Sequence, residues 1–266
     1  MEWKKIGFIG CGNMGSALAQ AAAKKSRALC FANPTQEKAE RLCRELGGAV
    51  CSNQVVAEQC DLIFLGVKPQ KMKEVMEELR PTLHDRADRY VLVSMAAGWT
   101  LADLQSLSGA GTPIIRIMPN TPVSVGEGVI LYCTADVTEE EEQAFVSLME
   151  GAGALEAIEE SLIDVGGTLT GCGPAFADLF MEALADGAVA CGLPRDQALR
   201  FAAQMLLGSA KLALESGAHP GALKDSVCSP GGSTIQGVRT LEKGGLRSAV
   251  MEAIIAAFQK NQALGG

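Results

Sequence analysis

Residues 6–15 read IGFIGCGNMG, a short apolar run that ends in three glycines spaced as G-x-G-x-x-G. In a strand, turn and helix unit, the first glycine permits a tight turn and the second lets a pyrophosphate approach the backbone. The third allows the helix to pack closely on the strand. Because the amphipathic residues 14–23 follow directly, the stretch predicts the start of a dinucleotide-binding domain. A purely structural glycine-rich corner is the alternative, since the motif alone has low specificity.

The first half of the chain continues this alternation of strand-like and helix-like segments. Apolar runs predict strands, and the segments between them have helical periodicity, as in residues 36–46 and 70–79. Such alternation is typical of an α/β fold with a parallel, doubly wound sheet of the Rossmann type. The expected strands occupy residues 5–9, 28–32, 61–67, 90–94 and 113–118.

The second half of the chain has a different pattern, with long stretches rich in alanine, leucine and glycine. We therefore expect two domains, a dinucleotide-binding Rossmann domain over residues 1–160 and an all-α domain over residues 161–266. A helical domain of this size has little core of its own, so we expect it to form a homo-oligomer with a second subunit. A monomeric helical bundle is the alternative. The long stretches are residues 174–191, 195–216 and 245–264.

The composition excludes several classes of function. The 266 residues are 48% apolar and carry a formal charge of -8, which disfavours a nucleic-acid groove. No continuous apolar run approaches the ~18 residues of a membrane span, and no signal-peptide pattern is found. Nine cysteines form no C-x-x-C pair, which indicates free thiols in a reducing cytoplasm. With two histidines and no cluster at ligand spacing, we expect no metal site.

The end of the second expected strand indicates the preferred cofactor. NAD-specific proteins usually carry Asp or Glu there to bind the ribose hydroxyls, but this chain has Asn33 and Thr35. Both side chains can donate hydrogen bonds to a 2′-phosphate without repelling it, and Lys38 lies one turn into the next helix. The sequence thus favours NADP(H), with NAD(H) as the second choice. An Asn-Pro turn followed by a threonine helix cap explains the same residues without a ligand.

Five further segments carry a specific resemblance to a known family. Three follow expected strands, GVKP at 66–69, SMAAG at 94–98 and RIMPNTP at 116–122, and so lie where an open α/β sheet binds its ligand. Two lie in the second half, TGCGPAF at 170–176 and SPGGSTI at 229–235. Together with the glycine turn, they resemble the pyrroline-5-carboxylate reductase family over essentially the whole chain.

This resemblance implies a function, an assembly and a cofactor site. Members of the family are oxidoreductases that reduce L-1-pyrroline-5-carboxylate to L-proline with NAD(P)H, the last step of proline biosynthesis. They join an N-terminal Rossmann domain to a helical domain that interlocks into dimers, often assembled further into decamers. Carried onto this chain, the cofactor would contact Ile9, Gly10, Cys11, Gly12, Asn13, Met14, Gly15, Asn33, Thr35, Asn53, Val67, Lys68, Pro69, Ala96 and Ala97, with Asn120 near the nicotinamide.

The resemblance also implies a substrate loop, partly formed across the dimer, with Thr234 as the catalytic hydroxyl against the imine nitrogen. Independently of the family, the backbone N–H groups of a probable helix start in this loop can bind a carboxylate. The alternative is that Ser233 or Thr234 only caps that helix. The expected substrate-binding residues are Ser229, Gly231, Gly232, Ser233 and Thr234.

Lys68 follows the expected strand at residues 61–67 and lies beside a proline. A catalytic acid, a phosphate contact and a surface charge are its three interpretations. We interpret it as a positioning residue that steers anions toward the cofactor cleft without donating the proton.

Three other functions are alternatives to this one. A 3-hydroxyacid dehydrogenase-like enzyme needs a lysine soon after the glycine-rich turn of its interdomain helix, but residues 171–180 contain none and the next is Lys211. Another imine reductase is a second alternative. A catalytically silent dinucleotide-binding protein would share the glycine turn, but it gives no reason for the SPGGST segment.

Overall fold

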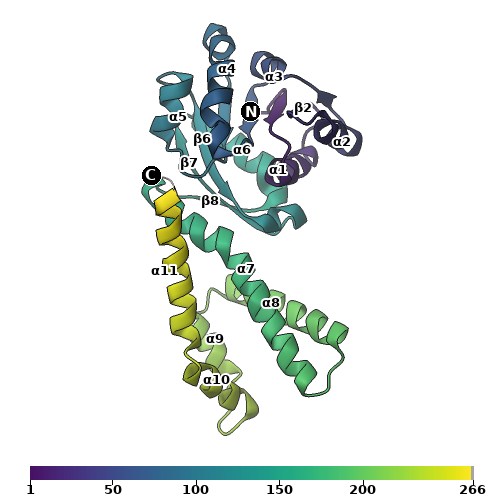
Figure 1. The fold of residues 1–266 in the computed structure, drawn as a ribbon, viewed down its shortest axis with the longest axis vertical. Helices are drawn as coiled ribbons and strands as arrows, with labels where there is room; N and C mark the ends of the chain where they lie inside the picture. The colour runs from purple at the N-terminus through teal and green to yellow at the C-terminus, as the bar shows by residue number, and fades with distance from the viewer. Residues whose placement is uncertain (265–266) are drawn as a thin grey trace. The chain divides into compact units, whose positions relative to one another are not determined.

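Figure 1 shows the computed structural model of the protein, which describes residues 1–264. The chain forms two compact units. The sheet unit comprises residues 1–171 and the stretch that begins at Phe258, and the helical unit comprises Cys172–Ala257. The boundary predicted at 160/161 coincides instead with the start of helix α7 (Glu160–Ala190). The two divisions differ because α7 continues from one unit into the other without a loop.

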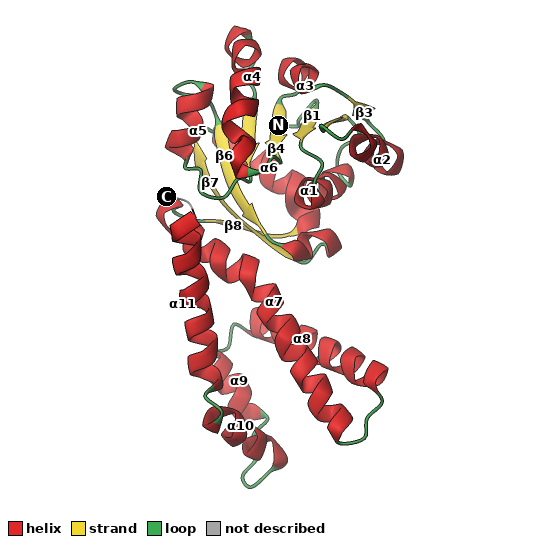
Figure 2. Ribbon diagram, viewed as in Figure 1, coloured by secondary structure: helices red, strands yellow, loops and turns green. Residues whose placement is uncertain are grey.

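An eight-stranded sheet forms the centre of the sheet unit (Figure 2). Its order is β3-β2-β1-β4-β5-β6-β7-β8, in which β6 and β7 are antiparallel and the other neighbouring pairs are parallel. The order from β3 to β6 is that of a Rossmann fold, so the predicted fold class is confirmed. The strands are β1 (Ile6–Ile9), β2 (Leu29–Ala32), β3 (Ala49–Val50), β4 (Leu62–Leu65), β5 (Val91–Ser94), β6 (Ile114–Pro119), β7 (Gly128–Ala135) and β8 (Gly153–Ala157).

The central strands are short apolar runs because both faces of the sheet are covered. Every residue of β1, β2, β4 and β5 is buried. On one face the rings of Phe8 and Phe64 stack with their centroids 4.6 Å apart, and Phe31 lies 5.8 Å from Phe8. These aromatic contacts tie three neighbouring strands together.

Helices cover the two faces of this sheet. Helices α1, α2 and α6 supply buried residues to one core cluster, and α3, α4 and α5 supply them to the other. Helices α5 and α6 begin at capping boxes formed by Thr100 with Asp103 and by Thr138 with Glu141. The bounds are α1 (Asn13–Ala23), α2 (Gln36–Leu46), α3 (Asn53–Gln59), α4 (Met72–Asp85), α5 (Leu101–Ser108) and α6 (Glu139–Met149), with short 3₁₀ helices η1 (Pro69–Lys71), η2 (Thr121–Val125) and η3 (Glu150–Ala152).

Some elements of the sheet unit differ from the prediction. The strands β3, β7 and β8 were not predicted, and α4 continues past the expected residue 79 through Pro81. The apolar run in β7 is a strand signal. In contrast, β8 reads GALEA, whose alanine and glutamate favour a helix. Only its pairing with β7 makes that segment extended.

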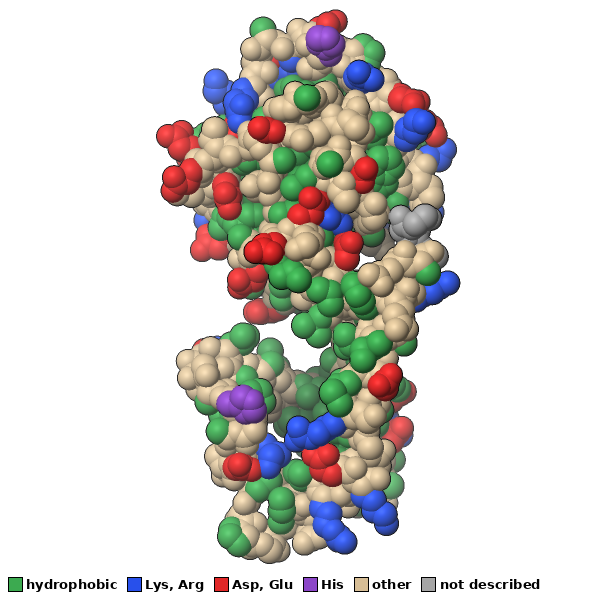
Figure 3. Space-filling model, turned by 90° about the vertical axis from the view of Figure 1, so that its left-hand side faces the viewer, with side chains coloured by type: hydrophobic (Ala, Val, Ile, Leu, Met, Phe, Trp, Pro, Cys, Tyr) green, Lys and Arg blue, Asp and Glu red, His purple; other side chains and the backbone are tan. Residues whose placement is uncertain are grey.

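The helical unit has little buried apolar surface. Its described residues include three buried hydrophobic side chains, Ala185, Ala198 and Ala202. Figure 3 shows hydrophobic side chains at the surface of this unit, and the large exposed ones are Leu179, Leu199, Phe201, Met205, Leu207, Leu212, Leu214, Val227, Leu241, Val250, Met251 and Ile255. An isolated copy of the unit therefore lacks a core of large side chains. Its helices after α7 are α8 (Arg195–Ser216), α9 (Pro220–Ser226), α10 (Ser233–Lys243) and α11 (Leu246–Leu264), which ends in the sheet unit.

Candidate functional site

The glycine-rich turn after β1 brings three backbone segments into close contact. Gly10 has a φ of +101°, and a Cβ atom on it would lie 2.5 Å from the Gly66 carbonyl oxygen. A Cβ atom on Gly15 would lie 2.2 Å from the Gly10 carbonyl oxygen. Side chains are excluded at both positions, so the predicted tight turn and close helix packing are confirmed.

The start of α1 has room and backbone donors for an anion. Gly12 is the N-cap, no side chain caps the helix, and the first turn has no acidic residue. A Cβ atom on Gly12 would meet nothing within 4 Å. The first-turn N–H groups lack intrahelical acceptors, and the helix dipole favours negative charge there. The turn therefore fits a dinucleotide pyrophosphate. The side chains of Ile9 and Cys11 are buried in the core, so these two residues can offer only backbone to a ligand, whereas Asn13 is exposed and Met14 half-buried.

The loop after β2 is bonded directly to the glycine turn. The Asn33 Oδ1 atom accepts a hydrogen bond from the Cys11 N–H at 2.8 Å, and Asn33 Nδ2 donates one to the Thr35 carbonyl oxygen at 2.9 Å. Thr35 occupies the N-cap position of α2, but its hydroxyl makes no cap hydrogen bond. The hydroxyl is thus available to a ligand. Lys38 and Glu37 are both exposed on the first turn of α2, so the positive charge there is partly offset.

The loops after β4 and β5 are joined by a side chain that the sequence did not single out. The indole Nε1 of Trp99 donates a hydrogen bond to the Pro69 carbonyl oxygen at 3.1 Å. Because Pro69 ends the segment 66–69 and Trp99 follows the segment 94–98, this bond fixes one predicted cofactor loop against the other. Of the predicted cofactor residues here, Val67 and Pro69 are half-buried, Lys68 and Ala97 are exposed, and Ala96 is buried.

Two asparagines predicted to contact the cofactor have structural partners. Asn53 is the first residue of α3, and its Nδ2 atom donates to Glu78 Oε2 at 3.1 Å. Asn120 is buried, with Oδ1 accepting from the Val129 N–H at 2.8 Å and Nδ2 donating to the Thr170 carbonyl oxygen at 3.1 Å. Asn120 therefore joins β6, β7 and α7, and its contact with the nicotinamide stays a prediction.

The predicted substrate loop ends at the start of α10, in the helical unit. Gly231 has a φ of +73°, and the Gly232 N–H donates to the Ser229 carbonyl oxygen at 3.0 Å. Gly232 is the N-cap of α10, and no side chain caps the helix. The alternative in which Ser233 or Thr234 caps α10 is therefore wrong. Both are exposed first-turn residues, and the first turn contains no acidic residue, so its N–H groups can bind a carboxylate.

A buried arginine holds the N-terminal end of α7 in place. Arg116 on β6 is 2% exposed, and its guanidinium donates to Glu160 at 3.1 Å and to Asp164 at 2.7 Å. Glu160 also accepts a hydrogen bond from the Leu101 N–H at 2.6 Å. The Arg116 Nε atom is buried without a partner among the described residues. The RIMPNTP segment thus supplies an anchor for α7, which sequence reasoning missed because its partners lie far along the chain.

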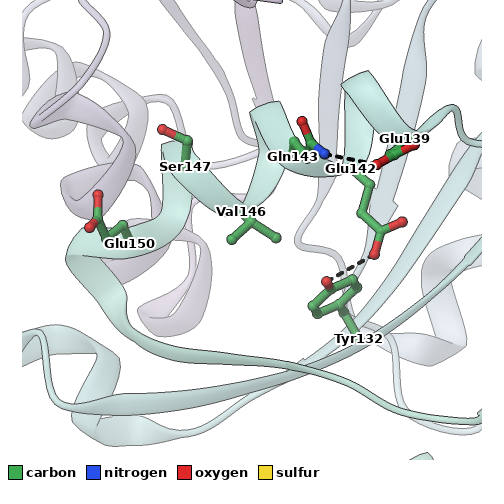
Figure 4. A pocket seen from close by; sticks show the side chains of 7 residues that line it. All are labelled: Tyr132, Glu139, Glu142, Gln143, Val146, Ser147 and Glu150. Carbon is green, nitrogen blue, oxygen red and sulfur yellow. Dashed lines mark hydrogen bonds between the residues drawn. The ribbon is translucent and has the colours of Figure 1, made fainter.

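A cavity of about 650 Å³ shares no residue with the predicted site. The Tyr132 hydroxyl donates to Glu142 at 2.9 Å inside it (Figure 4). Burial, together with this carboxylate, raises the pKa of Tyr132 to about 12. An acidic lining repels both an anionic substrate and cofactor phosphates, so the cavity does not suit them. Its lining residues are Tyr132, Glu139, Glu142, Gln143, Val146, Ser147 and Glu150.

Residues 1–264 contain no group of three or more His, Cys, Asp and Glu side chains arranged to hold a metal ion. Within the same range, no helix has both the length and the apolar character needed to cross a membrane.

Two family models match the chain, one in each half. Residues 5–98 match the model described as NADP oxidoreductase coenzyme F420-dependent. Residues 160–264 match the model described as pyrroline-5-carboxylate reductase dimerisation.

Similar proteins extend the match to the full length. The pyrroline-5-carboxylate reductase of Escherichia coli is 43% identical over 98% of this chain and 98% of its own. The one from Arabidopsis thaliana is 40% identical over 98% of this chain and 95% of its own. Among solved structures, the pyrroline-5-carboxylate reductase of Coxiella burnetii gives a TM-score of 0.90 at 31% identity, and the Plasmodium falciparum pyrroline carboxylate reductase with NADP bound gives 0.86 at 32%. Each alignment covers 98% of both chains.

Proposed function

Because this chain belongs to the pyrroline-5-carboxylate reductase family, we propose that its two uncapped helix starts serve one reaction, the reduction of L-1-pyrroline-5-carboxylate to L-proline by NAD(P)H. Helix α1 binds the cofactor pyrophosphate, and α10 binds the substrate carboxylate. The assignment depends on a feature that α1 and α10 have in common at their N-termini. Each has a glycine N-cap, no side-chain cap and no acidic residue in its first turn.

The cofactor is NADP(H), with NAD(H) as the second choice. The loop after β2 carries no carboxylate at Asn33 or Thr35, where one would repel a 2′-phosphate. The Thr35 hydroxyl makes no capping hydrogen bond to α2, so it can bond to a 2′-phosphate. The Plasmodium falciparum relative, which is similar over 98% of both chains, holds NADP. Lys68 is exposed after β4, where it can attract anions toward the strand ends.

Substrate binding is assigned to the loop before α10. The N–H groups of the first turn hold the carboxylate, which orients the ring and leaves the Thr234 hydroxyl for the imine nitrogen. Ser229 and Gly231 shape the loop, since the Ser229 carbonyl oxygen accepts the Gly232 N–H.

When bound, the reduced nicotinamide supplies a hydride to the imine carbon. Thr234 is far too weak an acid to protonate the nitrogen, so the substrate arrives already protonated there. The Thr234 hydroxyl accepts a hydrogen bond from that protonated nitrogen and fixes the orientation of the ring. The C=N π electrons move onto nitrogen as the hydride arrives, which gives the secondary amine of proline without a protein acid.

The active assembly is a homodimer, which can associate further into decamers. The helical unit leaves large apolar side chains exposed, and residues 160–264 match a dimerisation model. All nine cysteines are free thiols, which suits a reducing cytoplasm.

The experiment is an assay of NADPH oxidation with L-1-pyrroline-5-carboxylate, a panel of 3-hydroxyacids with NADP⁺, other cyclic imines and a no-substrate control. We expect proline formation from the pyrroline alone at a high kcat/KM. Faster turnover of a 3-hydroxyacid or a different imine would select the corresponding alternative. Dinucleotide binding with no turnover of any of these would instead indicate a silent binding protein.

A further inference from the structure

Asn33 is bonded to two separate parts of the proposed cofactor site. Its Oδ1 atom accepts the Cys11 N–H at 2.8 Å, and its Nδ2 atom donates to the Thr35 carbonyl oxygen at 2.9 Å. Cys11 lies in the turn assigned to the pyrophosphate, and Thr35 lies in the loop assigned to the 2′-phosphate. One half-buried amide therefore spans both loops.

These bonds limit what Asn33 can offer a ligand directly. A side-chain amide has one acceptor oxygen and two N–H donors, and here the oxygen and one N–H have backbone partners, which leaves a single N–H of Asn33. In contrast, the neighbouring Thr35 hydroxyl makes no cap hydrogen bond, and Lys38 is exposed on the first turn of α2. The groups free to contact a 2′-phosphate are thus the Thr35 hydroxyl, the Lys38 ammonium and the second N–H of Asn33.

We propose that Asn33 is a positioning residue that acts through the backbone of Cys11 and Thr35, holding the pyrophosphate turn and the 2′-phosphate loop in register. The inference rests on the proposed dinucleotide function and deepens it. Its consequence concerns selectivity. A residue that holds the pyrophosphate turn supports NADPH and NADH alike, whereas a direct 2′-phosphate contact supports NADPH alone.

NADPH and NADH both contain the pyrophosphate, so a change in the turn that binds it alters the affinity for both cofactors. Losing the Cys11 bond frees a backbone donor and lets the turn move away from the conformation that α1 needs to bind an anion. Losing the Thr35 bond frees the loop that carries the selective hydroxyl. Asn33→Ala removes both bonds, so its main effect is common to the two cofactors.

The test measures the dissociation constants of NADPH and NADH by calorimetric titration of the full-length protein. We expect Asn33→Ala to weaken both cofactors by a similar factor, roughly 5- to 20-fold. Thr35→Ala should weaken NADPH by roughly 3- to 10-fold and leave NADH within about 2-fold. A loss confined to NADPH in Asn33→Ala would overturn the inference and restore Asn33 as a direct contact.

A second variant separates positioning from general destabilisation. Asn33→Asp keeps an acceptor for the Cys11 N–H but cannot donate to the Thr35 carbonyl oxygen. NADH affinity should therefore recover toward that of the unmodified protein, while NADPH affinity stays low because a carboxylate also repels the 2′-phosphate. If NADH binds Asn33→Asp as poorly as it binds Asn33→Ala, the bond to Cys11 has no positioning role.

Gln105→Ala is the matched control. Its amide also joins two segments, donating to the Thr112 carbonyl oxygen at 3.2 Å and to Asp136 at 2.6 Å, beside the amino end of β6. Its cofactor affinities should not change, and a loss equal to that of Asn33→Ala would contradict a local role. Because the titration needs no pyrroline, a protein that binds as expected but reduces no imine refutes the proposed reaction and keeps this inference.

Discussion

The two units of this chain bury their apolar side chains to very different extents. In the sheet unit, Phe8, Phe31, Phe64 and Phe145 are all at most 1% exposed. In the helical unit, the buried hydrophobic side chains are alanines, and Leu214 is 86% exposed. Burial of apolar area is the main source of stability, so the sheet unit has its own core. The helical unit must obtain most of its burial by association.

The candidate site shows the same difference. In the sheet unit, the loops at the strand ends are held by side chains such as Asn33, Trp99 and Asn120. In the helical unit, Ser233 and Thr234 are exposed at the start of a helix that has no buried residue. We therefore expect cofactor binding to survive loss of the assembly, and substrate turnover to depend on it.

The largest effect should come from charge on the exposed face of α8. Leu207 and Leu214 are 56% and 86% exposed and lie seven residues apart, on one side of the helix. Replacing both by Asp would bury carboxylates in a subunit contact at a cost of several kcal/mol each. Light scattering should find a monomer, kcat/KM should fall by roughly 100-fold or more, and NADPH should still bind.

Val125→Asp is the control for that prediction. Val125 is 75% exposed but belongs to the sheet unit, so a carboxylate there should leave both the assembly and the activity unchanged. An oligomer that persists in the double α8 variant would mean that this face of the helix is not a subunit contact.

Thr234→Ala tests the substrate site of the helical unit directly. Losing one hydrogen bond of ~1.5–3 kcal/mol should lower kcat/KM by roughly 10- to 150-fold, with near-normal NADPH affinity. The residual activity should fall further at high pH, because less substrate arrives protonated. Thr240→Ala, on the same helix, is the control, since that hydroxyl donates only to the Gln236 carbonyl oxygen.

Full activity in Thr234→Ala would remove this residue from the mechanism. Unchanged turnover with a collapsed NADPH affinity would place the loop on the cofactor instead.

Arg116→Met tests the anchor of α7 in the sheet unit. Removing this buried cation leaves Glu160 and Asp164 without their ion-pair partner, although both carboxylates keep some contact with solvent. The free energy of unfolding should fall by about 2–3 kcal/mol. Arg247→Met removes an exposed ion pair with Glu242 in the helical unit and should leave the free energy of unfolding nearly unchanged. Chemical denaturation measures both values, and equal losses would contradict the contrast between the units.

A smaller effect with a defined pH dependence is expected at Glu141. Burial raises the pKa of this carboxyl, but hydrogen bonds from Arg89 and Thr138 outweigh burial and hold the pKa below its ordinary value of 4.5. The resulting stabilisation is present above pH 4.5 and is lost as the pH falls through the lowered pKa. Glu141→Gln should therefore lower stability by roughly 1–2 kcal/mol at pH 7.

The difference between Glu141→Gln and the unmodified protein should shrink in acid. Urea midpoints measured across the acid range check this trend. A gap that stays constant down to low pH would mean that the charge of Glu141 contributes nothing.

Much of the sheet unit could be predicted from local sequence. The glycine turn and the apolar runs encode β1, β2, β4, β5 and β6 because their signals lie within a few residues. The role of Arg116 could not be predicted, since its partners lie 44 and 48 residues further along the chain. The extended conformation of β8 could not be predicted either, because its pairing with β7 overrides a composition that favours a helix.

The residues of the candidate site stay a prediction, and their interactions could not be predicted from the sequence. Motif matching selected Asn33 and Asn120, yet it gave no sign that both amides are bonded to backbone groups of neighbouring segments. Nor could the pattern decide whether Thr35 and Ser233 cap their helices, because capping depends on a side-chain rotamer and on which residue is the N-cap.

The most direct test of the contrast between the units is a size-resolved assay. The full-length protein is separated by gel filtration with light scattering, and each fraction is assayed for NADPH binding and for proline formed per NADPH consumed. We predict that oligomeric fractions form one proline per NADPH, and that monomer from the α8 double variant binds NADPH without forming proline. Proline formation by a stable monomer, or NADPH consumption without proline, would contradict the account.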